Sequence, residues 1–270
     1  MKKTVLITGC SSGIGKAAAF YFHEKGWNVA ATMRRPDTEC ELTRLANLAC
    51  LRLDVTETRS IQKAIRDTEE RFGAIDVLVN NAAYNLTGPF EGATPDQIQA
   101  LYEVNVFGVM NVTREILPYF RKKHTGMIIN VSSLGGLIGM PLSSFYASAK
   151  WAVEGFSESL RFELRKLGIH VKIVEPGGVK TRFASNSIIV RKNDVPSYEE
   201  TIEKRLAAYE RRRPKLSDPK VIAKVVFLAA VDNNNNRLRY LAGNDAKILW
   251  FLRRSLPFRL FTELLGRLAG

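Results

Sequence analysis

Two side chains near the middle of the chain have the types and spacing needed for acid–base chemistry. Tyr146 and Lys150 are four residues apart, so on a helix they lie on the same face. A free tyrosine, with a pKa of ~10, is a poor acid or base near neutral pH, whereas a neighbouring ammonium group favours the phenolate. We therefore expect Lys150 to lower the pKa of Tyr146 and make it a general acid/base.

Ser133 is a candidate partner, because a hydroxyl can hydrogen-bond a substrate oxygen and stabilise the charge that develops there. Simpler interpretations exist for every one of these residues. A Tyr–Lys pair at helical spacing is usually an ordinary surface pair, and Ser132 with Ser133 can form a turn at a strand end. Asn105 alone can mark a helix kink or a satisfied polar contact. Spacing by itself therefore does not assign the roles.

A glycine-rich segment, Thr8–Gly15, joins the first apolar run to the first helical pattern. Gly9 permits a tight turn, Gly13 lets the backbone approach a pyrophosphate, and Gly15 allows close packing of helix on strand. The N-terminus of the following helix offers free N–H groups to phosphates. The segment predicts a dinucleotide site.

The residues after the second apolar run indicate which dinucleotide is bound. A site that prefers NAD usually has an acidic residue there for the ribose 2′-hydroxyl, but no acid occurs before Asp37. Arg34 and Arg35 occupy the place instead, and a guanidinium can bind a 2′-phosphate through two hydrogen bonds. We expect NADP(H) to be preferred over NAD(H), the alternative being two solvated loop arginines.

Short apolar runs alternate with helical patterns through the first 180 residues. The runs are 4–8, 27–32, 50–53, 75–79, 127–131 and 170–174, with a last short one at 238–242, and the helical patterns include 14–25, 58–72 and 151–167. Thr94-Pro95-Asp96-Gln97 and Asp218-Pro219 are typical helix starts. The alternation predicts an α/β fold with one doubly wound parallel sheet (a Rossmann fold), helices on both faces, and ligands at the carboxyl ends of the strands.

The motifs occur in the order found in the short-chain dehydrogenase/reductase family, which the chain resembles from residue 4 to about 185. Residues 135–146 and 151–156 are similar to the hydroxysteroid and retinol dehydrogenase branch. The other motifs are Asp54 in LDVT, Asn80-Asn81-Ala82-Ala83, Asn105 in VNVFG, Ser133 in NVSS, Tyr146 with Lys150, and Pro176-Gly177-Gly178 leading to Thr181. Ala83 and Ala149 depart from the common Gly and Ser of the family, and neither handles protons.

The resemblance implies an oxidoreductase that moves hydride between a nicotinamide cofactor and a carbonyl/alcohol pair, with Asn105, Ser133, Tyr146 and Lys150 as catalytic residues. The interval of 13 residues to Tyr146 is common in the family and favours Ser133 over Ser132. By the same resemblance Lys150 binds the nicotinamide ribose, and Asn105 holds a water that links Lys150 to solvent. The expected cofactor-binding residues are Gly9, Ser11, Ser12, Gly13, Ile14, Gly15, Arg34, Asp54, Val55, Asn81, Ala82, Ala83, Tyr146, Lys150, Pro176, Gly177, Val179 and Thr181.

The substrate is expected to be a lipophilic ketone or alcohol, because apolar residues precede Tyr146. Leu137, Ile138, Met140, Leu142 and Phe145 would supply an apolar wall. Residues 185–215 are charged and helical in pattern, as expected of a variable substrate loop within a single domain spanning 1–270.

Residues 244–270 form an amphipathic tail. Leu260, Phe261, Leu264, Leu265 and Leu268 share one helical face, and Pro257 separates this piece from an upstream apolar run. The tail is expected to be a lid over the substrate pocket or an oligomer contact, or alternatively a segment that lies on an anionic membrane surface.

Composition narrows the remaining function classes. With 46% apolar and 25% charged residues the chain is not intrinsically disordered, and three cysteines suit the reducing cytoplasm rather than a disulfide framework. We expect no signal peptide, no membrane span and no metal site. The net charge of +13 lies mostly in residues 185–270, with 17 basic and 9 acidic residues. A nucleic-acid-binding protein and a non-catalytic dinucleotide sensor remain alternatives, although no nucleic-acid recognition motif accompanies the charge.

By resemblance a homodimer or homotetramer is expected, built on the helix of Tyr146 and the helix before it. Leu160 and Leu164 would serve that contact or the core.

Overall fold

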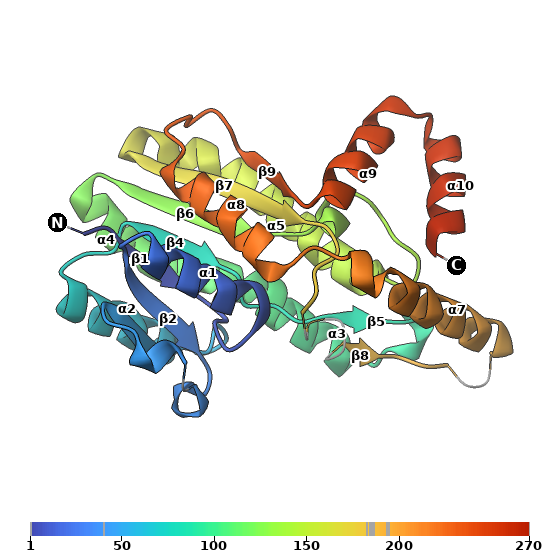
Figure 1. Ribbon diagram of the computed structural model, residues 1–270, viewed down its shortest axis with the longest axis horizontal. Helices are drawn as coiled ribbons and strands as arrows, with labels where there is room; N and C mark the ends of the chain where they lie inside the picture. Colours follow the sequence, from blue (N-terminus) through green and yellow to red (C-terminus); the bar gives the residue numbers. More distant parts are fainter. Residues whose placement is uncertain (1, 40, 182, 184–186, 193–194, 270) are drawn as a thin grey trace.

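The computed structural model describes residues 2–39, 41–181, 183, 187–192 and 195–269. Seven parallel strands form its central sheet in the order β3-β2-β1-β4-β6-β7-β9 (Figure 1). The strands are β1 (Thr4–Ile7), β2 (Asn28–Met33), β3 (Leu48–Arg52), β4 (Val77–Asn80), β6 (Gly126–Val131), β7 (Ile169–Pro176) and β9 (Arg239–Ala242). The order reverses at β1, so the carboxyl ends of β1 and β4 flank a crevice.

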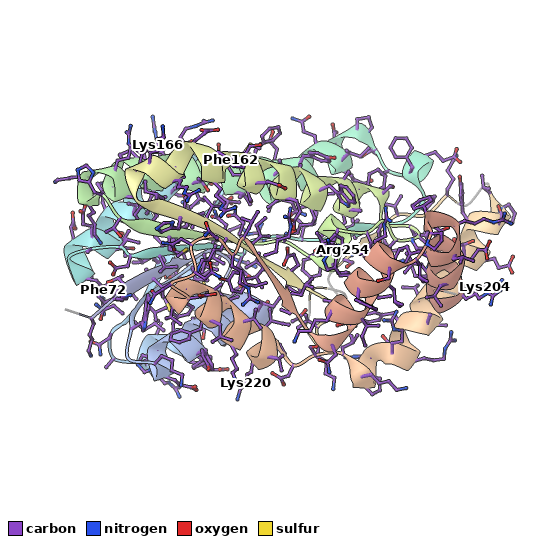
Figure 2. The ribbon with its side chains drawn as sticks, turned by 90° about the horizontal axis from the view of Figure 1, so that it is seen from above. Phe72, Phe162, Lys166, Lys204, Lys220 and Arg254 are labelled. Carbon is purple, nitrogen blue, oxygen red and sulfur yellow. The ribbon has the colours of Figure 1, made fainter. Side chains whose placement is uncertain are left out.

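Helices cover both faces of the sheet, because successive strand residues point to opposite sides. Val5 and Ile7 pack with α1 (Gly13–Glu24) and α8 (Pro219–Val231). Leu6 packs on the opposite face, within a second core. That core also contains residues of α2 (Thr58–Phe72), α4 (Gly108–Lys123) and α5 (Ser144–Leu164). Charged side chains such as Lys166 and Lys220 lie on the outside (Figure 2). The predicted doubly wound fold is confirmed.

Most element boundaries match the sequence prediction, and the helix starts at Thr94 and Asp218 are confirmed by their side-chain caps. The important difference is α5, which begins at Ser144 and not at the predicted Trp151. Tyr146 and Lys150 are buried in its first two turns. The first two turns mix serines with buried aromatic and alanine residues and have no side-chain N-cap bond, so the sequence shows no clear helix start there.

A wide π-helical turn, Glu103–Phe107, joins α3 (Pro95–Tyr102) to α4. Asn105 lies in this turn and is fully buried. The irregularity suggested by an asparagine inside a helical pattern is therefore real, and it re-aims one polar side chain inward.

The last third of the chain extends beyond the carboxyl ends of the strands. A small parallel sheet pairs β5 (Leu86–Thr87) with β8 (Ile188–Ile189), and α7 (Pro196–Arg212) follows it. After β9, α9 (Asn244–Ser255) and α10 (Phe258–Ala269) rise and fold back, so that α10 ends beside α7 (Figure 1). No helix among the described residues has the length and apolar character needed to cross a membrane.

Candidate active site

A cavity of about 930 Å³ opens at the carboxyl ends of the strands. It is lined by the glycine-rich loop, the ends of β2, β3, β4 and β6, the start of α5, and residues from α7, α9 and α10. Nearly all the predicted site residues line it. The exceptions are Gly15, which packs behind the loop, and Asn105, which lies behind the cavity wall. The structure thus brings one continuous set of residues to a single cavity.

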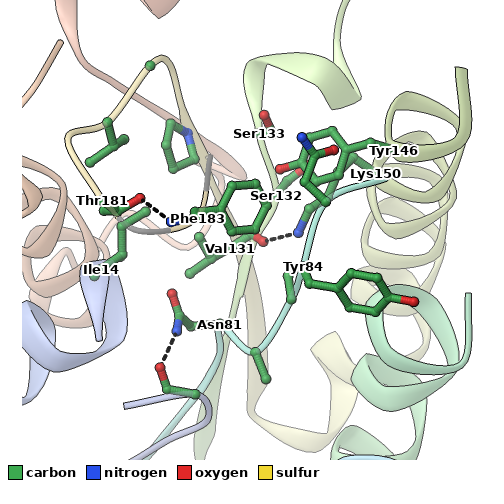
Figure 3. A pocket seen from close by; sticks show the side chains of 18 of the residues that line it. Ile14, Asn81, Tyr84, Val131, Ser132, Ser133, Tyr146, Lys150, Thr181 and Phe183 are labelled. Atoms are coloured by element: carbon green, nitrogen blue, oxygen red, sulfur yellow. Dashed lines mark hydrogen bonds between the residues drawn. The ribbon is translucent and has the colours of Figure 1, made fainter. Parts of the chain in front are cut away.

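Tyr146, Ser133 and Lys150 converge on the same part of this cavity (Figure 3). The Ser133 hydroxyl hydrogen-bonds the Tyr146 phenol and lowers its pKa. The Lys150 ammonium donates to the Val131 carbonyl at 2.9 Å and lies 5.8 Å from the centre of the Tyr146 ring. Phe183 packs edge-on against the other side of that ring, with centroids 5.7 Å apart. The phenol is therefore held in one orientation by groups on both sides.

The pKa of Tyr146 is raised in this structure, not lowered as the sequence led us to expect. Burial raises the pKa of Tyr146 to about 12, and the hydrogen bond with Ser133 offsets only part of that rise. Burial also lowers the pKa of Lys150 to about 8, against the opposing charge of Glu154. Desolvation is the largest cause of both shifts, because both side chains are buried. The phenol is thus protonated at neutral pH.

Ser132 and Ser133 differ in their surroundings. Ser133 accepts a hydrogen bond from the Gly135 amide at 3.1 Å, and its hydroxyl lowers the pKa of Tyr146. The Ser132 hydroxyl is buried and makes no hydrogen bond with a described residue. This contrast supports the choice of Ser133, which the spacing to Tyr146 favoured.

Asn105 holds the loop that follows β4. Its side-chain oxygen accepts from the Tyr84 amide at 3.0 Å, and its side-chain nitrogen donates to the Tyr84 carbonyl at 2.8 Å. Both ends of the amide are thus paired with one backbone unit. Asn105 therefore fixes the segment opposite Lys150 in place, a contact that sequence reasoning had not identified.

The glycine-rich loop has the shape that a dinucleotide phosphate needs. Gly9 and Gly13 have φ values of +73° and +59°, which favour glycine. A Cβ at Gly9 would lie 2.8 Å from Ala82 Cα, and one at Gly15 would collide with the Gly9 carbonyl oxygen. No described side chain caps α1, so the positive end of that helix is open to an anion. The residues present fit a dinucleotide.

Two further contacts shape the cofactor end of the cavity. Thr8 accepts from the amides of Asn81 and Ala82 at 2.9 and 3.0 Å, which ties the β1 and β4 loops together. Asp245 accepts from the Gly178 amide at 2.6 Å, and a Cβ on Gly177 would collide with it. Asp245 lies far along the chain in α9, and no sequence pattern pointed to it.

Arg34 lines the cavity at the end of β2, and no ion pair of its guanidinium occurs among the described residues. Glu39, which follows β2 a few residues after Arg34, is occupied by other groups. It accepts from Lys16 at 3.1 Å and from the amides of Glu41 and Leu42. These bonds keep the pKa of the Glu39 carboxyl below its usual range despite its burial.

The predicted apolar wall is mostly wrong. Of its five residues only Met140 lines the cavity; Leu137 and Ile138 are buried against Phe261 of α10, and Phe145 belongs to a separate core. The tail supplies the wall instead, through Leu249 and Leu265. Sequence reasoning failed here because apolar residues near a site pack inward as readily as toward a ligand.

The tail packs over the cavity through two of its leucines, as the lid among the alternatives for this segment would. The proposed apolar face is divided, however, because Phe261 is buried while Leu260 is half exposed, and the side chain of Leu268 lies outside the described residues. Leu160 and Leu164 belong to the core and not to a surface contact. Among the described residues no cluster of His, Cys, Asp and Glu could hold a metal ion.

Comparison with known proteins agrees with the resemblance. A family model described as short chain dehydrogenase matches residues 3–189. The 17-beta-hydroxysteroid dehydrogenase type 1 of Homo sapiens is 32% identical over 255 residues, covering 88% of this chain and 77% of the relative. A solved short-chain dehydrogenase from Streptomyces avermitilis superposes with a TM-score of 0.83 at 32% identity, over 98% of this chain and 96% of its own. The structure of ElxO with NADP bound gives 0.74 at 29% identity, over 89% and 98%. The chain therefore belongs to the short-chain dehydrogenase family.

Proposed function

We propose that this protein is an NADP(H)-dependent oxidoreductase that interconverts a carbonyl and an alcohol on a lipophilic substrate. The observation that carries the proposal is the meeting of Tyr146, Ser133 and Lys150 in one cavity that continues into the glycine-rich loop. The NADP in ElxO and the steroid in the name of the human relative support the cofactor and the lipophilic substrate.

The residues divide the work of carbonyl reduction as follows. A reduced nicotinamide held by the glycine-rich loop and Lys150 would supply the hydride for the carbonyl carbon. The Tyr146 hydroxyl gives its proton to the carbonyl oxygen, and Ser133 donates a hydrogen bond to the same oxygen. Lys150, with its pKa near 8, returns a proton to the phenolate and binds the nicotinamide ribose. Asn105 positions the loop that faces Lys150 and the proposed relay water. The high pKa of Tyr146 keeps the phenol protonated before reduction.

Replacement of the proton donor tests this function. Tyr146→Phe is expected to abolish NADPH-dependent turnover of ketones and aldehydes while binding of NADPH, followed by its fluorescence, stays within a few-fold. Tyr102→Phe is the matched control, because Tyr102 hydrogen-bonds Ser148 outside the cavity. More than a few per cent of the native rate in Tyr146→Phe contradicts the assignment, and absence of turnover in the native protein on a panel up to steroid size favours a dinucleotide sensor.

We also propose that the tail contacts an anionic membrane surface while it covers the cavity. Four of its apolar side chains point to solvent: Ile248, Phe251, Phe258 and Leu260, which are 57%, 67%, 65% and 52% exposed. Arg253, Arg254 and Arg259 lie among them, and apolar residues flanked by arginines suit an anionic bilayer surface. Such a location brings the cavity close to lipophilic substrates. The cytoplasmic location and the homodimer or homotetramer are further proposals.

A further inference from the structure

One face of α7 forms part of the cavity wall. Arg205, Ala208, Tyr209 and Arg212 line the cavity, and their spacing of three, four and seven residues places them on one side of the helix. Two of the four are arginines. The tail lines this end of the cavity with leucines, and α7 adds positive charge.

The Arg205 guanidinium is held by neutral groups only. It donates to the Pro141 carbonyl and, at 2.9 Å, to the Ser143 hydroxyl. Burial and the charge of Arg212 both lower the pKa of Arg205 from its usual value. No carboxylate pairs with either arginine among the described residues. Arg205 is partly buried and Arg212 is exposed at the cavity, so two like charges line one cavity with no carboxylate between them. An anion bound between them would offset their repulsion.

The other charged residues of α7 are arranged differently. Lys204 pairs with Glu200 at 2.7 Å and lies at the outer edge of the molecule (Figure 2). Arg213, which follows the helix, pairs with Glu210 at 3.4 Å. The remaining cation of α7, Arg211, is exposed and does not line the cavity, so Arg205 and Arg212 are the cations of α7 that face it.

The position of these arginines separates them from the phosphate-binding loop. Arg205 bonds Pro141 and Ser143, which immediately precede α5 and its Tyr146. The two acidic residues of the cavity lie elsewhere: Asp54 follows β3, and Asp245 is bonded to the Gly178 amide. The α7 end is therefore the substrate end, bounded by apolar Met140, Leu249 and Leu265 and by positive charge.

We propose that the substrate is an amphiphile, a ketone, aldehyde or alcohol with an apolar body and an anionic group that Arg205 and Arg212 bind. A carboxylate and a phosphate monoester both match a guanidinium pair, because each accepts two parallel N–H bonds. The inference rests on the proposed function and defines its substrate class: the apolar body lies against the tail, the carbonyl meets Tyr146, and the anionic end meets α7.

The test compares oxo compounds of equal chain length that carry a carboxylate, its methyl ester, or a phosphate monoester. NADPH oxidation is followed over a series of lengths. The native protein is expected to use at least one of the two anions with a kcat/KM roughly 10- to 100-fold above that of the ester, the range of a charged hydrogen bond. The anion that is favoured shows whether the natural substrate carries a carboxylate or a phosphate monoester. Equal kcat/KM values for the ester and both anions overturn the inference and leave the proposed function intact. If no compound is turned over, the proposed function itself is contradicted.

Substitutions then assign the effect to α7. Arg212→Ala is expected to remove the preference for the anion while the KM for NADPH and the kcat/KM of the ester remain within about three-fold. Arg211→Ala is the matched control, since Arg211 is exposed and does not line the cavity. Arg205→Met is the second variant, whose folding is checked by its melting temperature. A higher KM for NADPH with the anion preference unchanged overturns the inference, because the guanidinium then serves the cofactor phosphates.

A binding measurement separates the inference from catalysis. Calorimetric titration of the native protein with a saturated fatty acid and the fatty alcohol of the same length needs no turnover. Binding of the acid at least ~10-fold tighter, and loss of that difference in Arg212→Ala, supports the inference. Equal affinities contradict it, whatever the activity assays show.

Discussion

Tyr146 shows how burial and charge compete at a single residue. Its phenol lies one helical turn from an ammonium group, yet its pKa rises because water is excluded from the site. The spacing of Tyr146 and Lys150 was readable from the sequence, whereas the direction of the shift was not. That direction depends on tertiary burial; the Val131 carbonyl accepts a hydrogen bond from Lys150, and Phe183 packs edge-on against the Tyr146 ring. Neither contact has a sequence signature.

Arg34 is the residue to which we assign the proposed preference for NADP(H). Arg34→Ala is expected to raise the KM for NADPH more than ~10-fold and the KM for NADH less than ~3-fold, because only the former has a 2′-phosphate to lose its guanidinium partner. Steady-state kinetics with each cofactor measures this. Arg44→Ala is the control, an exposed arginine of the same region outside the cavity. Equal use of NADPH and NADH by the native protein contradicts the preference.

At the level of elements, ion pairs connect the last strand, β9, to α5, the helix that contains Tyr146. Arg239 of β9 lies 3.2 Å from Glu154 and 3.0 Å from Glu158, both on α5, and 3.6 Å from the fully buried Glu175 of β7. Glu175 also accepts from the Tyr240 amide at 3.0 Å. Glu154 is one turn from Lys150, so this cluster fixes the start of α5 relative to the sheet.

The cluster makes stability depend on pH. Burial, with the nearby charge of Glu154, raises the pKa of Glu175 to about 8. The native state therefore holds a proton that the unfolded chain releases above pH ~4.3, and the free energy of unfolding falls as pH rises toward 8. Between pH 5 and 8 we expect a loss of roughly 1–3 kcal/mol in denaturant titrations.

Glu175→Gln is expected to flatten this dependence, because the amide keeps the bond from Tyr240 without titrating. Glu158→Gln is the control: it touches the same arginine from an exposed position. A native protein whose stability is constant or rises from pH 5 to 8 would falsify the assignment to Glu175.

The elements differed in how well the sequence predicted them. Buried parallel strands such as 127–131 are continuous apolar runs, and the capping box at Thr94 is a local signal, so both were found. The pair of Leu86–Thr87 with Ile188–Ile189 joins two-residue strands a hundred residues apart. A strand that short has no periodicity, and its partner is set only by the tertiary fold. The small sheet was therefore not predicted.

On the scale of the whole molecule, the tail covers the cavity with one face and exposes apolar residues on the other. The protein is expected to co-sediment with vesicles that contain phosphatidylserine at low salt and to dissociate as salt screens the arginines. Phe251→Ser with Phe258→Ser should abolish this binding and spare the lid, whose cavity-lining residues are Leu249 and Leu265.

The control for the membrane prediction is Phe162→Ser, which removes a 73% exposed aromatic residue from α5, far from the tail (Figure 2). It should bind vesicles as the native protein does. Sedimentation of the double variant equal to native, or none by the native protein at low salt, would leave the tail as a lid alone.

The order of elements along the chain also bears on how such a protein evolves. The glycine-rich loop and Tyr146 with Lys150 all precede β8, whereas α7, α9 and α10 follow it and supply the cationic and apolar wall. Because α9 and α10 come after the last strand, changes there leave the register of the sheet untouched. Descendants of one ancestor can therefore acquire new substrates through changes in α7, α10 and the later turns of α9, while Asp245 stays with the inherited cofactor site.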